Sequence, residues 1–140
     1  MKALLSDDID AMNYYMNQII MTTFSYFDVG QNEPERFYHG FVLGLMVELE
    51  NRYMITSNRE SGFGRYDVML EPRNKIDDAM ILEFKVQDSD EKSLEDTVKA
   101  ALKQIDEKQY AVSLIEKGVP ESHIRKYGFA FCGKRVLIGK

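Results

Sequence analysis

Hydrophobic residues recur at helical spacing through the first third of the chain. Met12, Met16 and Ile19 fall three or four positions apart, which is typical of one buried face of an α-helix. A second stripe of the same spacing runs from Phe37 to Leu49, after a segment that resembles a helix-capping box. The pattern therefore predicts two helices, over residues 6–24 and from about 34 to 50.

The period changes after residue 52, where short runs rich in aromatic and β-branched residues alternate with turn-forming segments. One long amphipathic helix is predicted from Ser93 to Gly118, and Gly133-Lys134 is expected to join two final strands as a tight turn. The order α-α-β-β-β-α-β-β predicts an α/β fold with a central mixed β-sheet flanked by helices. The predicted strands cover residues 53–57, 66–70, 79–86, 127–132 and 135–138.

Composition fits one compact domain over residues 1–140, because 44% of the residues are hydrophobic and no low-complexity tract is present. The single cysteine, Cys132, excludes an internal disulfide and is expected to be buried and inert in its strand. No signal-peptide pattern is present, and the longest apolar run, Phe41–Val47, is too short to span a bilayer. The sequence predicts a soluble cytoplasmic protein without a membrane partner.

The net charge of -5 disfavours tight, sequence-independent binding to nucleic acid, because that affinity comes mainly from basic groups that displace counterions. The acids gather in residues 88–107, however, whereas basic residues gather around residues 59–73 and 125–140. One face could still be positive, so charge alone leaves a nucleic-acid partner open.

Two charged residues interrupt the apolar strand predicted over residues 79–86. Glu83 and Lys85 are two positions apart, so they share one face of that strand. A buried charge is costly unless it is paired or bound to a metal. One interpretation is a solvated Glu–Lys pair on an edge strand, and the other is a functional site.

Asp67 favours the functional interpretation. It opens the strand predicted over residues 66–70, and if that strand forms a hairpin with 79–86, Asp67 lies beside Glu83. Two neighbouring carboxylates repel each other unless a cation lies between them. Oxygen ligands with room for water and phosphate suit Mg²⁺ or Mn²⁺, and a nearby lysine can orient or deprotonate an attacking water.

These residues also carry a resemblance. Asp67 followed by Glu83-Phe84-Lys85 matches the D…(D/E)-x-K signature of the PD-(D/E)XK phosphodiesterases, the restriction-endonuclease-like superfamily. From about residue 5 to 138 the chain resembles the nuclease domain that follows an AAA-ATPase-like domain in many bacterial proteins. The segments that carry this resemblance are ERFYHGFVLGL (35–45), SNRESGFGRYD (57–67), ILEFKV (81–86), ALKQIDEKQY (101–110) and YGFAFCGKRVL (127–137).

The resemblance implies a restriction-endonuclease-like core in which Asp67 and Glu83 are metal ligands and Lys85 is the catalytic lysine. Gln104 resembles the glutamine that some members bring to the site from the helix after the E-x-K strand. It also borders the apolar stripe of its helix, although a hydrogen bond to the backbone explains that position equally well. No G-x-x-x-x-G-K-[ST] run is present, so the chain is expected to be a nuclease domain excised from a longer protein.

Four further residues have two interpretations each. Arg65 has the planar fork that binds phosphate oxygens, or it pairs with Glu60. Glu60 is a candidate additional ligand in the turn before the site, and His39 projects toward the site or packs in the core. Tyr110 is a candidate for stacking on a base, although packing against the helix is the commoner role of such a tyrosine.

The sequence thus predicts a Mg²⁺- or Mn²⁺-dependent nuclease that acts on DNA, or less favourably on RNA, by water attack on phosphate. The main alternative is a nuclease fold retained as a weakly active or silent interaction module, which the acidic net charge favours. A third class is a small-molecule metalloenzyme that uses the same carboxylates. A homodimer is open, because many nucleases of this fold cut both strands as dimers.

Overall fold

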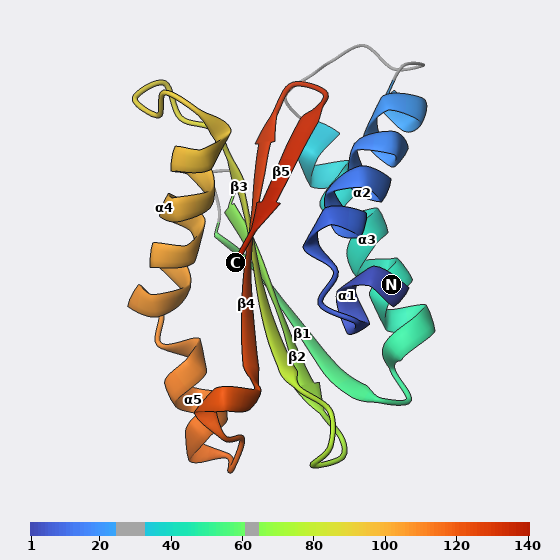
Figure 1. Ribbon diagram of the computed structural model, residues 1–140, viewed down its shortest axis with the longest axis vertical. Helices are drawn as coiled ribbons and strands as arrows, with labels where there is room; N and C mark the ends of the chain where they lie inside the picture. Colours follow the sequence, from blue (N-terminus) through green and yellow to red (C-terminus); the bar gives the residue numbers. More distant parts are fainter. Residues whose placement is uncertain (25–32, 61–64) are drawn as a thin grey trace.

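The chain folds around a five-stranded sheet with helices on both faces (Figure 1). This computed structural model describes the backbone of residues 1–24, 33–60 and 65–140, and the side chains of residues 1–22, 40–58 and 66–140. The strands lie in sequence order across the sheet, and every neighbouring pair is antiparallel except β3 and β4, which are parallel. The strands are β1 (Tyr53–Glu60), β2 (Arg65–Pro72), β3 (Ala79–Val86), β4 (Ile124–Cys132) and β5 (Arg135–Gly139). The predicted mixed sheet flanked by helices is confirmed.

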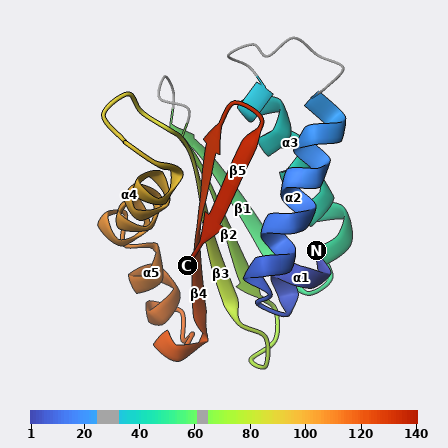
Figure 2. The same ribbon diagram turned by 45° about the horizontal axis from the view of Figure 1, so that its top comes forward.

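The helices divide between the two faces of the sheet. The first three helices cover one face, and the last two cover the other (Figures 1 and 2). The parallel β3–β4 pair requires a crossover, and the last two helices provide it. The helices are α1 (Lys2–Leu5), α2 (Ile9–Phe24), α3 (Glu33–Leu49), α4 (Leu94–Glu107) and α5 (Tyr110–Glu116), with a 3₁₀ turn at Glu121–His123.

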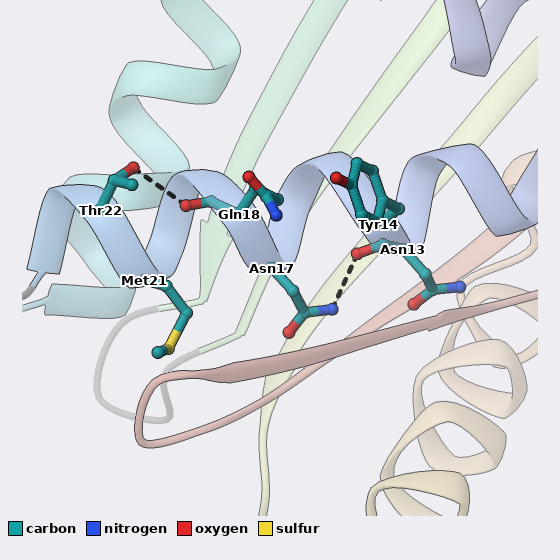
Figure 3. A pocket seen from close by; sticks show the side chains of 6 residues that line it. All are labelled: Asn13, Tyr14, Asn17, Gln18, Met21 and Thr22. Carbon is teal, nitrogen blue, oxygen red and sulfur yellow. Dashed lines mark hydrogen bonds between the residues drawn. The ribbon is translucent and has the colours of Figure 1, made fainter.

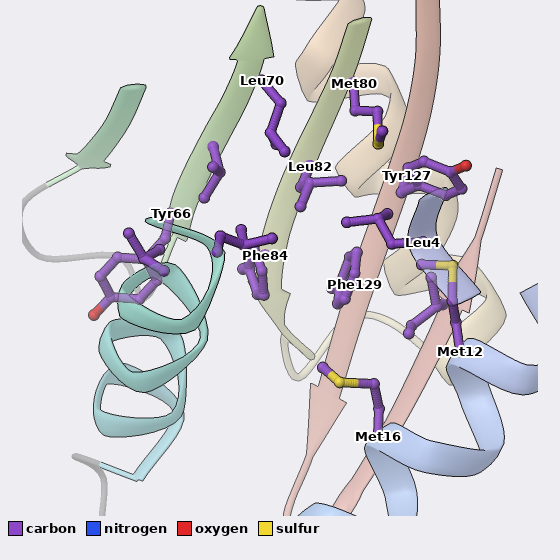
Figure 4. Packing of buried hydrophobic residues seen from close by; sticks show 14 of the residues in the cluster. Leu4, Met12, Met16, Tyr66, Leu70, Met80, Leu82, Phe84, Tyr127 and Phe129 are labelled. Carbon is purple, nitrogen blue, oxygen red and sulfur yellow. The ribbon is translucent and has the colours of Figure 1, made fainter. Parts of the chain in front are cut away.

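The face covered by α1–α3 holds the main apolar core. Leu82 and Phe84 of β3 point into it, and the Phe84 ring stacks on Phe129 of β4 with ring centroids 4.6 Å apart (Figure 4). Met12 and Met16 are buried there, as the first helical stripe predicts, but Ile19 of the same stripe is 48% exposed, which corrects that part of the prediction. The next positions of β3 necessarily face the other way, toward α4 and α5. Its charged residues therefore project from the face opposite the main core.

Two predicted helices differ from their expected bounds. The first begins at Ile9 and not at residue 6. The helix predicted over residues 6–24 is preceded by a separate turn of helix, and Asp7 between them has a left-handed backbone with φ of 57°. The N-cap of α2 is Asp8, whose carboxylate accepts a hydrogen bond from the Ala11 N–H, and not Ser6 or Asp7. The helix predicted from Ser93 to Gly118 begins as expected but breaks between α4 and α5.

Helix α4 approaches the sheet closely because residue 128 is a glycine. A Cβ atom at Gly128 would lie 2.9 Å from the Val98 carbonyl oxygen and 3.2 Å from the Ala101 Cβ. Gly128 is also the β4 partner of Glu83 in the parallel register. The helix is thus seated directly over the charged part of β3.

The edge strand β5 is covered by side chains of α2. Asn13 and Asn17, one turn apart, each exchange two hydrogen bonds with the backbone of β5, at Ile138 and Val136 respectively. These asparagines border a surface hollow along α2 (Figure 3). Because their amides satisfy the outer N–H and C=O groups of β5, they protect an edge that would otherwise be open to another strand.

The end of β4 corrects one expectation. Cys132 is exposed, although a buried cysteine was expected from its place in a strand. It is the last residue of β4, directly before the Gly133-Lys134 turn, and the exposed surface begins at this position. Among the described helices, none is both long and apolar enough to cross a membrane.

Candidate active site

Asp67 and Glu83 lie directly opposite each other on β2 and β3. The antiparallel register pairs their Cα atoms, and both side chains face α4 and α5. Their side chains are 3% and 1% exposed, so water screens their mutual repulsion poorly. The predicted hairpin, and with it the predicted juxtaposition of the two carboxylates, is confirmed.

A single ammonium group contacts both carboxylates. The Lys108 Nζ lies 2.9 Å from Asp67 Oδ2 and 3.3 Å from Glu83 Oε1. Asp67 also accepts hydrogen bonds from the Tyr110 hydroxyl at 3.0 Å and from the Asn58 amide at 3.1 Å. The described donors to the acidic pair thus come from β1, from the C-terminal cap of α4 and from the start of α5.

The backbone between α4 and α5 delivers two of these donors. Gln109 has a left-handed conformation, with φ of 56°, and separates Lys108 at the C-terminal cap of α4 from Tyr110 at the start of α5. A continuous helix would turn these two side chains about 200° apart, given its 100° per residue. The break lets both reach Asp67.

The environment of Tyr110 perturbs its acidity. Burial and the charge of Asp67, together with the hydrogen bond to Asp67, raise the pKa of the Tyr110 hydroxyl to about 12. The neutral phenol is therefore the form that donates to Asp67. Tyr110 also packs against the apolar cluster that contains Ile105 and Leu114, as the helix-packing interpretation predicts, and base stacking stays a prediction.

Lys85 lies on the same face of β3 as Glu83, but its ammonium group has other partners. The Lys85 Nζ is 2.8 Å from Asp88 Oδ2 and 2.6 Å from Glu91 Oε1, both in the loop after β3. Glu91 also accepts hydrogen bonds from the Asp88 N–H and the Thr97 hydroxyl. The side chain of Lys85 is 4% exposed, so this amine is buried among acids of its own loop.

Glu91 is held in its charged form. Burial alone would raise its pKa, but hydrogen bonds from the Asp88 N–H and the Lys85 ammonium, helped by Thr97, lower the pKa overall. The run Asp88–Glu91 is therefore more than the solvated loop that its acidity suggests. Asp88 is mostly exposed, whereas the Glu91 carboxylate is mostly buried.

The other predicted site residues are placed less completely. Gln104 lies half-buried on α4, one helical turn before Lys108. Its backbone carbonyl accepts the hydrogen bond from the backbone N–H of Lys108. The side chains of His39, Glu60 and Arg65 lie outside the described residues, so the predictions made for them stay predictions.

The acidic pair has the chemistry of a site for a hard divalent cation. Both candidate ligands are carboxylates, and two of their oxygens already converge on one positively charged group. Mg²⁺ is commonly held by one or two carboxylates together with water and substrate phosphate. In the part of the chain that the structure describes, no cluster of three or more acidic, histidine or cysteine side chains forms a fuller ligand set. The residues present therefore fit such an ion with a small protein ligand set.

Sequence reasoning missed Lys108, Asn58 and Glu91. Asn58 sits opposite Asp67 on β1 and shares its face, so the β1–β2 register would have identified it. Lys108 lies in the segment ALKQIDEKQY, one helical turn after Gln104, and this spacing on the same helix face as a candidate site residue could have identified it. For Glu91 the signal was the Ser93 cap, because it fixes the start of α4 and so places Glu91 in the short loop between β3 and that helix.

The surface hollows over α1 and α2 lie on the opposite face of the sheet. One is lined by α2 residues, including the two asparagines that bind β5 (Figure 3). A larger one is mainly apolar and lies between α1, α2 and Phe129. Neither contains the acidic pair, so the pair belongs to the α4/α5 side alone.

Comparison with protein families identifies a superfamily that the chain matches. A model described as "PD-(D/E)XK nuclease superfamily" matches residues 33–140, which span β1 to β5 and include both carboxylates and Lys85. Searches of curated proteins and of solved structures returned no significant match.

Proposed function

Because this chain belongs to the PD-(D/E)XK nuclease superfamily, we propose that it is a metal-dependent phosphodiesterase that cleaves DNA, with RNA as the less favoured substrate. The observation that carries this proposal is the pairing of Asp67 with Glu83 on adjacent strands, where both buried carboxylates share one cation. Two acids fixed in this way are costly to keep in a fold unless a cation binds them.

Asp67 and Glu83 are the proposed ligands of Mg²⁺ or Mn²⁺. A divalent ion held there would polarise the scissile phosphate and lower the pKa of a bound water. The Tyr110 hydroxyl and the Asn58 amide donate to Asp67 and so fix the orientation of its carboxylate. Such supporting donors are a general feature of metal sites in proteins.

Lys85 is the proposed catalytic lysine, which positions the attacking water and offsets charge on the phosphate. It projects from the same face of β3 as Glu83, two residues further along. Its ion pairs with Asp88 and Glu91 limit the conformations of its side chain. Gln104 and Arg65 are proposed to orient water or phosphate, Tyr110 to contact the substrate, and Glu60 and His39 to be accessory site residues.

A cleavage assay tests this function. Single-stranded DNA, duplex DNA, branched DNA and RNA are each incubated with the protein in Mg²⁺, in Mn²⁺ and in EDTA. We expect cleavage only with a divalent ion, and its loss in Asp67→Ala and in Lys85→Ala with circular dichroism unchanged. Asp106→Ala, which removes an exposed surface carboxylate, is the matched control and keeps full activity. Full activity of either site variant contradicts the mechanism.

The alternative is a silent nuclease fold that acts as an interaction module. The observation that favours it is that Lys85 and Lys108 both form ion pairs within the fold, at a net charge of -5. Calorimetry separates the two functions. Binding of Mn²⁺ that disappears in Asp67→Ala supports the enzyme, whereas no binding by the wild type supports the module.

The resemblance to domains that follow bacterial ATPase-like domains extends the proposal to partners. We expect an AAA-ATPase-like domain as the partner within a longer chain, in a bacterial cytoplasm, and a homodimer where both strands of a duplex are cut. Sedimentation of the isolated chain with and without duplex DNA tests the expected homodimer. A monomer under both conditions contradicts the dimer.

A further inference from the structure

Lys108 is the counterion of the acidic pair. Its ammonium group lies within 3.3 Å of an oxygen of each carboxylate, and it is the only group with described contacts to both. The two other described donors to the pair, Tyr110 and Asn58, are neutral. A divalent cation carries twice the charge of the Lys108 ammonium group, so the two carboxylates attract it more strongly.

A divalent ion and this ammonium group require the same place. Asp67 Oδ2 and Glu83 Oε1 both converge on the Lys108 Nζ. An ion that binds both oxygens uses the lone pairs that now accept these hydrogen bonds, and it repels a positive charge next to it. Simultaneous occupation is unfavourable on both grounds.

The position of Lys108 also allows its side chain to move away from the two carboxylates. It caps the C-terminus of α4, and its four-carbon side chain reaches the acids from a helix end, whereas Lys85 rises from the middle of the sheet. Its ammonium lies 5.8 Å from the centre of the Tyr110 ring, so the face of that ring offers a second resting place for the charge. Its side chain is 14% exposed, which gives it a path to solvent.

We propose that Lys108 competes with the divalent cation for Asp67 and Glu83 and thereby sets the metal affinity of the site. It stabilises the acidic pair when no ion is bound, and it moves away when the ion binds. This inference rests on the proposed function, because it takes the acidic pair as the metal site.

The test compares Mn²⁺ binding by calorimetry in the wild type, Lys108→Met and Lys103→Met. Lys103 is the matched control, since it lies on the same helix and forms only an exposed pair with Glu107. We expect Lys108→Met to bind Mn²⁺ about tenfold more tightly than the wild type. In the wild type the ion must displace a charge-assisted hydrogen bond, and this cost lowers the affinity by about that factor. Lys103→Met is expected to match the wild type.

Thermal unfolding gives a readout independent of catalysis. In EDTA, Lys108→Met is expected to melt below the wild type, because two buried acids lose their counterion. Saturating Mn²⁺ is expected to raise the melting temperature of this variant more than that of the wild type. If Lys108→Met does not fold, magnetic resonance of the wild type with ¹⁵N-labelled lysine amines replaces it, and the Lys108 ammonium signal is expected to shift on titration with Mg²⁺.

The outcomes separate the two proposals. Equal or weaker Mn²⁺ binding by Lys108→Met, or an unshifted Lys108 signal while Mg²⁺ binds, overturns the competition and leaves the proposed metal site intact. Absence of Mn²⁺ binding by both the wild type and Lys108→Met overturns the proposed function as well.

Discussion

Two lysines on the α4/α5 side of the sheet each lie between two carboxylates, yet their surroundings differ. The acids around Lys108 belong to two hydrogen-bonded strands, and both are almost fully buried. The acids around Lys85 belong to one loop, where the Asp88 side chain is 56% exposed and that of Glu91 is 12% exposed. We call these the strand cluster (Asp67, Glu83, Lys108) and the loop cluster (Lys85, Asp88, Glu91).

The difference concerns which partner can move. In the strand cluster the sheet register holds the acids together, so their repulsion persists whatever the lysine does. In the loop cluster the lysine is fixed in the strand and the acids fold back onto it, so they can separate if it is removed. The first arrangement favours exchange of one cation for another, and the second fastens the loop before α4 to the sheet.

The largest expected effect comes from neutralising one acid in each cluster. Asp67→Asn is expected to reduce Mg²⁺-dependent cleavage about a thousandfold, because it removes a proposed ligand of an ion worth several kcal/mol to the transition state. Asp88→Asn is expected to change the rate less than about fivefold, because the exposed pair it removes is worth at most about 1 kcal/mol. Initial rates under saturating Mg²⁺ measure both, and equal losses would remove the distinction between the clusters.

A stability effect should appear in the loop cluster. Glu91→Gln is expected to lower the free energy of unfolding by about 2 kcal/mol, because it leaves the buried Lys85 ammonium with one exposed partner. Urea denaturation followed by circular dichroism measures this loss. Asp90→Asn, an exposed acid of the same loop, is the matched control and should change stability by less than about 0.5 kcal/mol. Similar losses in both variants would mean that the Glu91 contacts add nothing to the fold.

The contribution of Glu91 should also depend on pH. Its folded-state pKa is lowered, so the stabilisation is complete above the ordinary carboxyl value near 4.5 and disappears as pH falls through the folded-state value. The difference in unfolding free energy between the wild type and Glu91→Gln is therefore expected to shrink as the pH is lowered from 7 toward 3. Urea melts at several pH values measure it, and a constant difference contradicts the assignment.

The sequence predicted the two acids of the strand cluster and the strand face that they share with Lys85, but not the partners of the Lys85 amine. Alternation along residues 79–86 puts Glu83 and Lys85 on one face, and the short turn-rich connection predicts the hairpin that brings Asp67 opposite. These inferences use only local geometry, which is why they succeed. The actual partners of the Lys85 amine depend on how a loop folds back, which no residue period encodes.

The break between α4 and α5 was not predictable in the same way. The segment contains neither glycine nor proline at the break, and the apolar stripe continues through Ile105 to Leu114. A continuous helix satisfies the local pattern. Contacts with the sheet, from Lys108 and Tyr110 to Asp67 and from Lys108 to Glu83, favour the interrupted form. Tertiary hydrogen bonds thus outweigh helix continuity at this point.

The smallest expected effect tests that interruption directly. Gln109 is exposed and has a left-handed backbone, which costs a residue with a Cβ roughly 1 kcal/mol relative to glycine. Gln109→Gly is therefore expected to raise the free energy of unfolding by about 0.5 kcal/mol after the greater freedom of glycine in the unfolded chain is subtracted. Gln109→Ala keeps the Cβ atom and is expected to show no gain. Urea denaturation distinguishes them, because a loss of stability in the glycine variant would mean that residue 109 prefers the continuous helix. In that case Lys108 and Tyr110 would not be held at Asp67 together, and the strand cluster would lose the feature that separates it from the loop cluster.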